Sequence, residues 1–143
     1  MSQKTDPELI GNHLIEEAIH AFKEQTTDET LAHVLTVIRN RVQEQGHLII
    51  AVDMVVQGAP LSIRPVTTSD GSKWWAVFTS YEEEMKGKGK AQPVSLFTAS
   101  MEQIFDQVKV VPEISGVIVN PWSESLPLNE KLIDLVMQYK TSN

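Results

Sequence analysis

The hydrophobic pattern of this 143-residue chain changes its period at His47, and this change constrains the fold more than any other feature. Before His47, apolar residues recur every three or four positions, first in residues 8–25 and then in a second stretch that begins near Thr26. This spacing predicts two amphipathic helices. Thr26 and Glu29 have the spacing of a capping box at the start of the second helix. Because the connecting turn is so short, we expect an antiparallel helical hairpin over residues 1–46.

Beyond His47, the apolar residues follow the two-residue period of β-strands. Three such stretches are His47–Val56, Leu61–Val66 and Lys73–Thr79. The segments between them are rich in Gly, Pro, Asp and Ser, which are typical turn residues. The pattern predicts three short strands in an antiparallel meander.

The second half of the chain alternates between helical and extended patterns. Ser80 and Glu83 have capping spacing and predict a short helix. Val94–Phe97, Ser100–Val111 and Ile114–Val119 then read as strand, helix and strand. A unit of this length predicts a right-handed crossover whose strands are parallel.

A last helix is expected after Asn129, which is a suitable N-cap residue. Its expected apolar positions are Leu132, Leu135, Val136 and Tyr139. The sequence has no internal repeat and no linker long enough to separate two domains. We therefore expect one α+β domain over residues 1–143, in which the meander is extended into a mixed sheet and the hairpin of residues 1–46 packs on that sheet.

The composition excludes several classes of function. The chain has no cysteine, which excludes disulfides, iron–sulfur clusters and thiol nucleophiles. Its longest apolar run, Leu48–Val52, is far shorter than the ~20 residues that span a bilayer. The formal net charge of −7 disfavours binding to a nucleic-acid backbone. We expect a cytoplasmic protein with neither a membrane nor a nucleic acid as its partner.

Two polar patterns in the sequence resemble ligand sites. His13, Glu17 and His20 share one face of the first helix, and such a trio could hold a divalent metal. A solvated helix surface is the favoured interpretation, because one helix face supplies too few fixed ligands. The run Lys86–Lys90 alternates Lys and Gly but lacks the spacing of a phosphate-binding loop, so we expect a flexible, exposed loop. Asp53 interrupts an apolar strand, where a hydrogen-bonded or edge-exposed carboxylate is favoured over a functional acid. No cofactor, metal or catalytic residue is predicted.

The tryptophans are the best candidates for binding. Adjacent strand residues point to opposite faces of a sheet, so Trp74 and Trp75 cannot enter the same core layer. One is expected to pack under the helices, and the other to be covered by another element or to join a surface patch. Trp122 follows Asn120-Pro121 at the expected end of a strand, where filling of the core explains a large aromatic side chain poorly.

Two passages resemble the SseB N-terminal domain family. The segment Trp75–Glu83 is similar to the family's V-F-T-S-x-E-E strand-to-helix passage. The segment Gly116–Pro121 resembles its G-x-x-I-N-P strand end, with Val119 in place of the isoleucine, and a Leu-x-Leu motif (Leu126–Leu128) and a closing helix follow. The resemblance spans about Thr27 to Tyr139.

The resemblance implies a small bacterial α+β protein named for enhanced serine sensitivity, a family distinct from the type III secretion translocon component of the same name. It carries over no catalytic residue, and it implies that this chain holds the first of the two domains found in longer members. Two function classes stay open. The favoured class is a non-enzymatic binding or regulatory module that uses an exposed aromatic surface to bind a protein partner or to self-associate. The alternative is an enzyme or a binder of a small anionic ligand, with a polar pocket near Asn120 and Ser80. The candidate functional patch comprises Trp75, Phe78, Thr79, Ser80, Asn120, Pro121 and Trp122.

Overall fold

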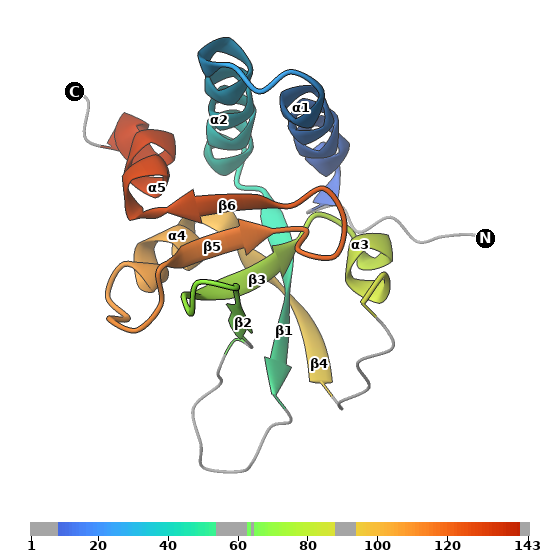
Figure 1. Cartoon of the computed structure of the whole chain (residues 1–143), viewed down its shortest axis with the longest axis vertical. Helices are drawn as coiled ribbons and strands as arrows, with labels where there is room; N and C mark the ends of the chain where they lie inside the picture. Colours follow the sequence, from blue (N-terminus) through green and yellow to red (C-terminus); the bar gives the residue numbers. More distant parts are fainter. Residues whose placement is uncertain (1–8, 54–62, 64, 88–93, 141–143) are drawn as a thin grey trace.

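The computed structural model describes residues 9–53, 63, 65–87 and 94–140 (Figure 1). The helices within this part are α1 (Asn12–Glu24), α2 (Asp28–Gln43), α3 (Tyr81–Met85), α4 (Met101–Val108) and α5 (Glu130–Val136), which continues into the 3-10 turn η2 (Met137–Lys140). The strands are β1 (His47–Asp53), β2 (Pro65–Thr67), β3 (Lys73–Phe78), β4 (Val94–Ser100), β5 (Gly116–Val119) and β6 (Leu126–Asn129). The prediction of an α+β fold with a mixed sheet and an N-terminal helical hairpin is confirmed.

The strands form one sheet in the order β4-β1-β3-β5-β6, and β2 pairs with the first half of β3. A single antiparallel bridge between Val52 and Ile63 links the end of β1 to the chain before β2. Since β2 has only three residues, β1 also pairs directly with β3, antiparallel, at Ile49–Phe78 and Ile50–Val77. The predicted meander therefore holds for β2 and β3, whereas β1 pairs with β3 and reaches the chain before β2 through the single bridge to Ile63. Half of the stretch Leu61–Val66 that was predicted as its middle strand (residues 61, 62 and 64) lies outside the described residues.

The crossover through α4 joins parallel strands, as predicted. β4 is antiparallel to β1, β1 is antiparallel to β3, and β3 is parallel to β5, so β4 and β5 run in the same direction. Two strands, β1 and β3, lie between them in the sheet. The crossover unit therefore spans the middle of the sheet instead of joining neighbouring strands.

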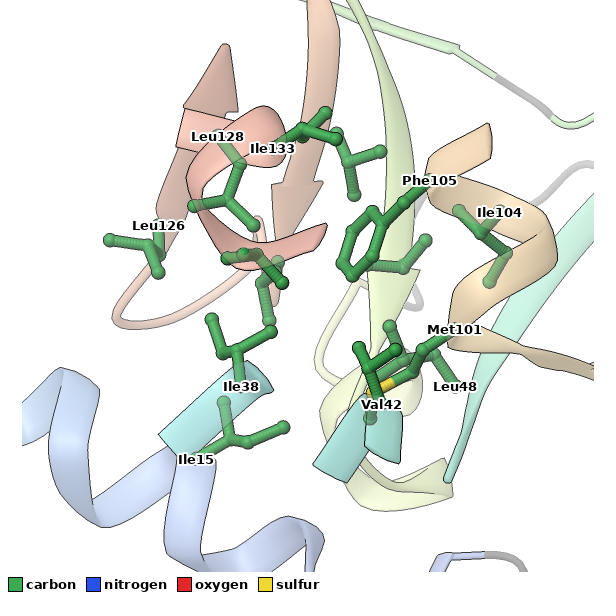
Figure 2. Close-up of a cluster of buried hydrophobic side chains, with 14 of the residues drawn as sticks. Ile15, Ile38, Val42, Leu48, Met101, Ile104, Phe105, Leu126, Leu128 and Ile133 are labelled. Carbon is green, nitrogen blue, oxygen red and sulfur yellow. The ribbon is translucent and has the colours of Figure 1, made fainter. Parts of the chain in front are cut away.

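The main core lies between one face of the sheet and helices α1, α2, α4 and α5. Figure 2 shows its centre, where α4 contributes Met101, Ile104 and Phe105, and strands β1 and β6 contribute Leu48 and Leu128. The other face of the sheet carries a smaller cluster of Ile49, Ala76, Phe78 and Ile118.

Two local predictions need correction. The N-cap of α2 is Thr27, whose Oγ1 accepts from the Thr30 amide at 3.1 Å, whereas the Thr26 hydroxyl donates to the Phe22 carbonyl at the end of α1. Asn129 does cap α5, but Leu135 is exposed. The buried residues after Asn129 are Ile133, Val136 and Met137, so the apolar stripe is rotated from the predicted one.

Strand β6 was not predicted at all. Its alternation is short, with Leu126 and Leu128 buried against the main core and Pro127 exposed between them. Proline lacks the N–H that a central strand needs, so it argued against a strand here. Because β6 is at the edge of the sheet, Pro127 is tolerated there.

Candidate functional site

The parallel ends of β3 and β5 bring two predicted residues, Thr79 and Asn120, into contact. Val77 is paired with Val119, which is the last residue of β5, and β3 ends one residue after Val77. The Thr79 amide donates to Asn120 Oδ1 at 3.0 Å, and Asn120 Nδ2 donates to Thr79 Oγ1 at 3.0 Å. Both side chains are buried. The pair thus satisfies its own polar groups, as buried polar groups require.

Asn120 also turns the chain out of the sheet. Its φ of 52° lies in the left-handed region, which asparagine tolerates better than most residues. Its amide donates to the Val77 carbonyl at 2.8 Å, and its carbonyl accepts from the Ser123 amide at 3.2 Å. The predicted turn at Asn120-Pro121 is therefore closed by hydrogen bonds on both sides, and it directs Trp122 away from β5.

Helix α1 is tied to these strand ends by side-chain hydrogen bonds. The Thr79 hydroxyl donates to Glu16 Oε2 at 2.5 Å. Asn12 Nδ2 donates to the Thr79 carbonyl at 3.1 Å and to the His47 carbonyl at 2.9 Å. The first two turns of α1 thereby contact the end of β3 and the start of β1.

A buried arginine extends this network to α2. Arg41 Nε donates to Asn12 Oδ1 at 3.0 Å, and Arg41 Nη1 pairs with Glu44 at 3.0 Å. The guanidinium fills the space beside Gly46, where an added Cβ would lie 2.6 Å from Nη2. Gly11 also lies against the guanidinium.

The sequence reasoning missed three members of this network: Asn12, Glu16 and Arg41. A signal did exist for Arg41, because it lies at helical spacing from the buried Val34 and Ile38 and so falls on the apolar side of α2. A charged residue at such a position needs a partner.

Trp122 is held at the rim of this site. Its ring centroid lies 6.4 Å from that of Phe78, with the two planes tilted by 32°. A Cβ added at Gly87 would lie 2.4 Å from Trp122 Nε1, so the indole packs on the backbone after α3. Trp122 is 37% exposed to solvent. Trp122 is therefore neither a core residue nor fully exposed.

The residues after Trp122 are anchored to two helices. Ser123 Oγ donates to Glu83 Oε1 of α3 at 2.5 Å. Glu124 pairs with His20 of α1 at 2.9 Å, and the second ring nitrogen of His20 lies 3.2 Å from Glu24. The hydrogen bond to the Glu124 carboxylate, with the negative charges of both glutamates, raises the pKa of His20 above its ordinary value. These contacts fix the backbone on which Trp122 is carried.

The predicted patch is only partly assembled. Four of its members lie together: Phe78, Thr79, Asn120 and Trp122. Phe78 is only 2% exposed, and its ring packs against that of Trp122. Trp75 does not lie with these residues, because it points to the opposite face of the sheet and packs against the main core. This opposition of faces was itself predicted for the tryptophan pair, since Trp74 joins the smaller cluster.

The two remaining patch residues have structural contacts. Ser80 caps α3, accepting from the Glu83 amide at 3.2 Å, which confirms the predicted helix start. Pro121 is half-buried behind Asn120. Ser80 Oγ is thus an acceptor in the helix cap, and both amide atoms of Asn120 are paired with Thr79.

The structure offers no support for the other polar candidates in its described part. His20 faces Glu124 and Glu24 instead of joining His13 and Glu17, and no three His, Cys, Asp or Glu side chains of the described residues form a metal-binding group. Lys86 pairs with Glu83 at 2.8 Å, and this contact raises the pKa of the lysine. The rest of the lysine run beyond Gly87, and the side chain of Asp53, lie outside the described residues.

Two cavities lined by described residues do not adjoin Asn120 or Ser80. One, of about 110 Å³, lies under the segment between α4 and β5, with Val108, Ile114 and Ile133 in its lining. The other is a shallow depression at the turn between α1 and α2. Neither fits the deep polar pocket that an enzyme near Asn120 would require.

Comparison with known proteins gives no relatives: no family model, curated protein or solved structure matches the chain. In the part of the chain that the structure describes, no helix has the length and apolar character to cross a membrane.

Proposed function

We propose that this chain is an SseB-like, non-enzymatic binding module of the cytoplasm, and that it contacts a protein partner through the surface around Trp122. The cysteine-free composition fits that compartment. The motifs at Trp75–Glu83 and Gly116–Pro121, which suggest the family, coincide with the two strand ends that build this surface.

One observation carries the proposal: a large aromatic side chain is 37% exposed although the backbone beneath it is fixed. Asn120 anchors the turn before Trp122, and Ser123 and Glu124 anchor the chain after it. An ordered tryptophan loses little conformational entropy on association, and tryptophan is enriched among residues that dominate binding energy. A structural role alone would be served by an indole buried on all sides.

The alternative of an enzyme or an anionic-ligand binder is less well supported. It required a polar pocket between Asn120 and the start of α3, but the polar atoms there bind one another. Helix α3 has only five residues, which gives a weak dipole for an anion.

The test is capture of partners from the native host with wild-type and Trp122→Ala baits, followed by mass spectrometry. We expect the variant to lose the captured partner. The matched control is Leu135→Ala, since Leu135 has a similar exposure of 40% but lies on α5. Equal capture by the wild type and Trp122→Ala would refute the proposal.

The folded state of the variant must be measured in parallel. Because about two-thirds of the Trp122 surface is buried against Phe78 and Gly87, we expect Trp122→Ala to lower the free energy of unfolding by about 2–3 kcal/mol. This lies between the cost below 1 kcal/mol expected of a pure contact residue and the ~3–5 kcal/mol of a core aromatic. The capture experiment therefore uses a temperature at which circular dichroism shows the variant to be folded.

A further inference from the structure

Strand β4 forms one edge of the sheet in the described part of the chain, and its own sequence lacks the residues that commonly protect such an edge. It pairs with β1 along all seven of its residues, from His47–Ser100 to Asp53–Val94, and no described strand pairs with its other side. Its sequence, Val-Ser-Leu-Phe-Thr-Ala-Ser, contains no charged residue and no proline. Exposed edges are usually shortened, bulged or furnished with Lys or Pro, because their free N–H and C=O groups can template pairing with another chain.

The opposite edge of the same sheet shows such protection. Strand β6 has only four residues, and Pro127 within it cannot donate a hydrogen bond to an added strand. The two edges of one sheet thus differ in length and in proline content, although both lie in the same chain. The β4 edge thus has neither the short length nor the internal proline of the β6 edge.

Phe97 lies at the midpoint of β4 and is 41% exposed. It pairs with Ile50 of β1, so it belongs to the face of the sheet that carries the main core, but the helices leave it uncovered. The residues on either side of it, from Ser95 to Ser100, are half-buried. A large apolar side chain at the centre of an edge strand is a suitable cross-strand partner for a copy of itself.

The geometry points to a homodimer in which β4 pairs antiparallel with β4 of a second copy, about a two-fold axis at Phe97. This register places the two Phe97 side chains opposite each other on the same face of a continuous sheet. It also places Leu96 opposite Thr98 of the second copy, and Ser95 opposite Ala99 of the second copy. Two-fold pairing is the commonest closed arrangement of identical chains, and each copy satisfies the edge of the other.

A second copy fits this edge better than an unrelated peptide. On the face that carries Phe97, the side chains two positions away on either side, Ser95 and Ala99, are both small and leave room for the Phe97 of a second copy. No charge on β4 opposes the approach of an identical strand, although the chain as a whole carries a net charge of −7. Since one strand pair buries a small area, we expect a dissociation constant of about 1–100 µM. This inference does not rest on the function proposed for Trp122.

The experiment is sedimentation velocity over a wide concentration range, with the wild type, Phe97→Lys and Phe97→Glu. We expect the wild type to shift reversibly from monomer to dimer, and each variant to stay monomeric, because like charges would face each other across the axis. An equimolar mixture of the two variants is expected to form a 1:1 heterodimer, since opposite charges then meet. Leu135→Lys is the matched control and is expected to dimerise like the wild type, as Leu135 is 40% exposed on α5.

Four results would overturn the inference: a wild type that is monomeric at every concentration, growth beyond a dimer, dimers of the single Phe97 variants equal to those of the wild type, or no heterodimer in the mixture. Amide hydrogen exchange of the wild type provides a readout that needs no variant. Alternate β4 amides are expected to gain protection as concentration rises, and protection independent of concentration would contradict the pairing.

Discussion

Replacing Asn120 by Gly or by Ala separates the two contributions of this residue. Both changes remove the acceptor of the buried Thr79 amide and the donor to Thr79 Oγ1. A buried amide left without a partner costs about 1–3 kcal/mol, and loss of an ordinary hydrogen bond costs about 0.5–1.5 kcal/mol. Both variants are therefore expected to lose about 2–4 kcal/mol of unfolding free energy.

The two variants differ in the backbone. At φ 52°, alanine bears a cost of roughly 1 kcal/mol that glycine does not. We expect Asn120→Ala to be less stable than Asn120→Gly by about 1 kcal/mol, which reverses the usual order of these residues in regular structure.

Urea denaturation followed by circular dichroism gives both values. Thr79→Val is the companion variant, because it removes the hydroxyl that Asn120 Nδ2 and Glu16 share while it keeps the shape of the side chain. Combined with Asn120→Ala, it should cost less than the sum of the single changes. Additive losses, or an alanine variant as stable as the glycine variant, would refute the account of this turn.

Two further predictions concern other positions. Gly116→Ala would place a Cβ 2.1 Å from the Leu128 carbonyl oxygen, so we expect it to disrupt the pairing of β5 with β6 and to lower the free energy of unfolding by more than ~2 kcal/mol. Gly71→Ala has open space for a Cβ but a φ of +88°, so it should cost about 1 kcal/mol. Equal losses of the two variants in thermal unfolding would contradict this ranking. Glu124 raises the pKa of His20 above 6.5 in the folded protein, so the stabilisation of the folded state by protonated His20 is fully present below pH 6.5 and is lost as the pH rises through the folded pKa. His20→Gln should remove this part of the pH dependence of the urea midpoint. An unchanged pH profile in the variant would count against the contact.

Much of the local structure could be predicted because its causes are local. The opposite faces of Trp74 and Trp75 follow from the two-residue period of a strand. The caps at Ser80, Ser100 and Asn129 follow from a side-chain oxygen three residues before a free amide. The cap of α2 was misplaced by one residue because Thr26 and Thr27 are both suitable and their neighbours decide between them.

Other features depend on contacts between distant segments and could not be predicted. The order of the strands places β1 and β3 between β4 and β5, and no local pattern specifies this order. The partial burial of Trp122 depends on Gly87, which is 35 positions earlier in the chain. A residue that follows a strand end can point outward or inward, and only the neighbouring helix decides which.

The buried polar network links stability to the proposed binding surface. Thr79 bonds to Glu16 of α1 on one side and to Asn120 on the other, and Asn120 begins the turn that carries Trp122. A change at Glu16 should therefore affect the position of Trp122 without touching it. Conversely, a partner bound to Trp122 would stabilise α1 through the same hydrogen bonds, because a ligand that favours one arrangement stabilises every contact on which that arrangement depends. Since Glu16 lies on α1 and Trp122 lies after β5, this coupling would make the helical hairpin part of the binding unit.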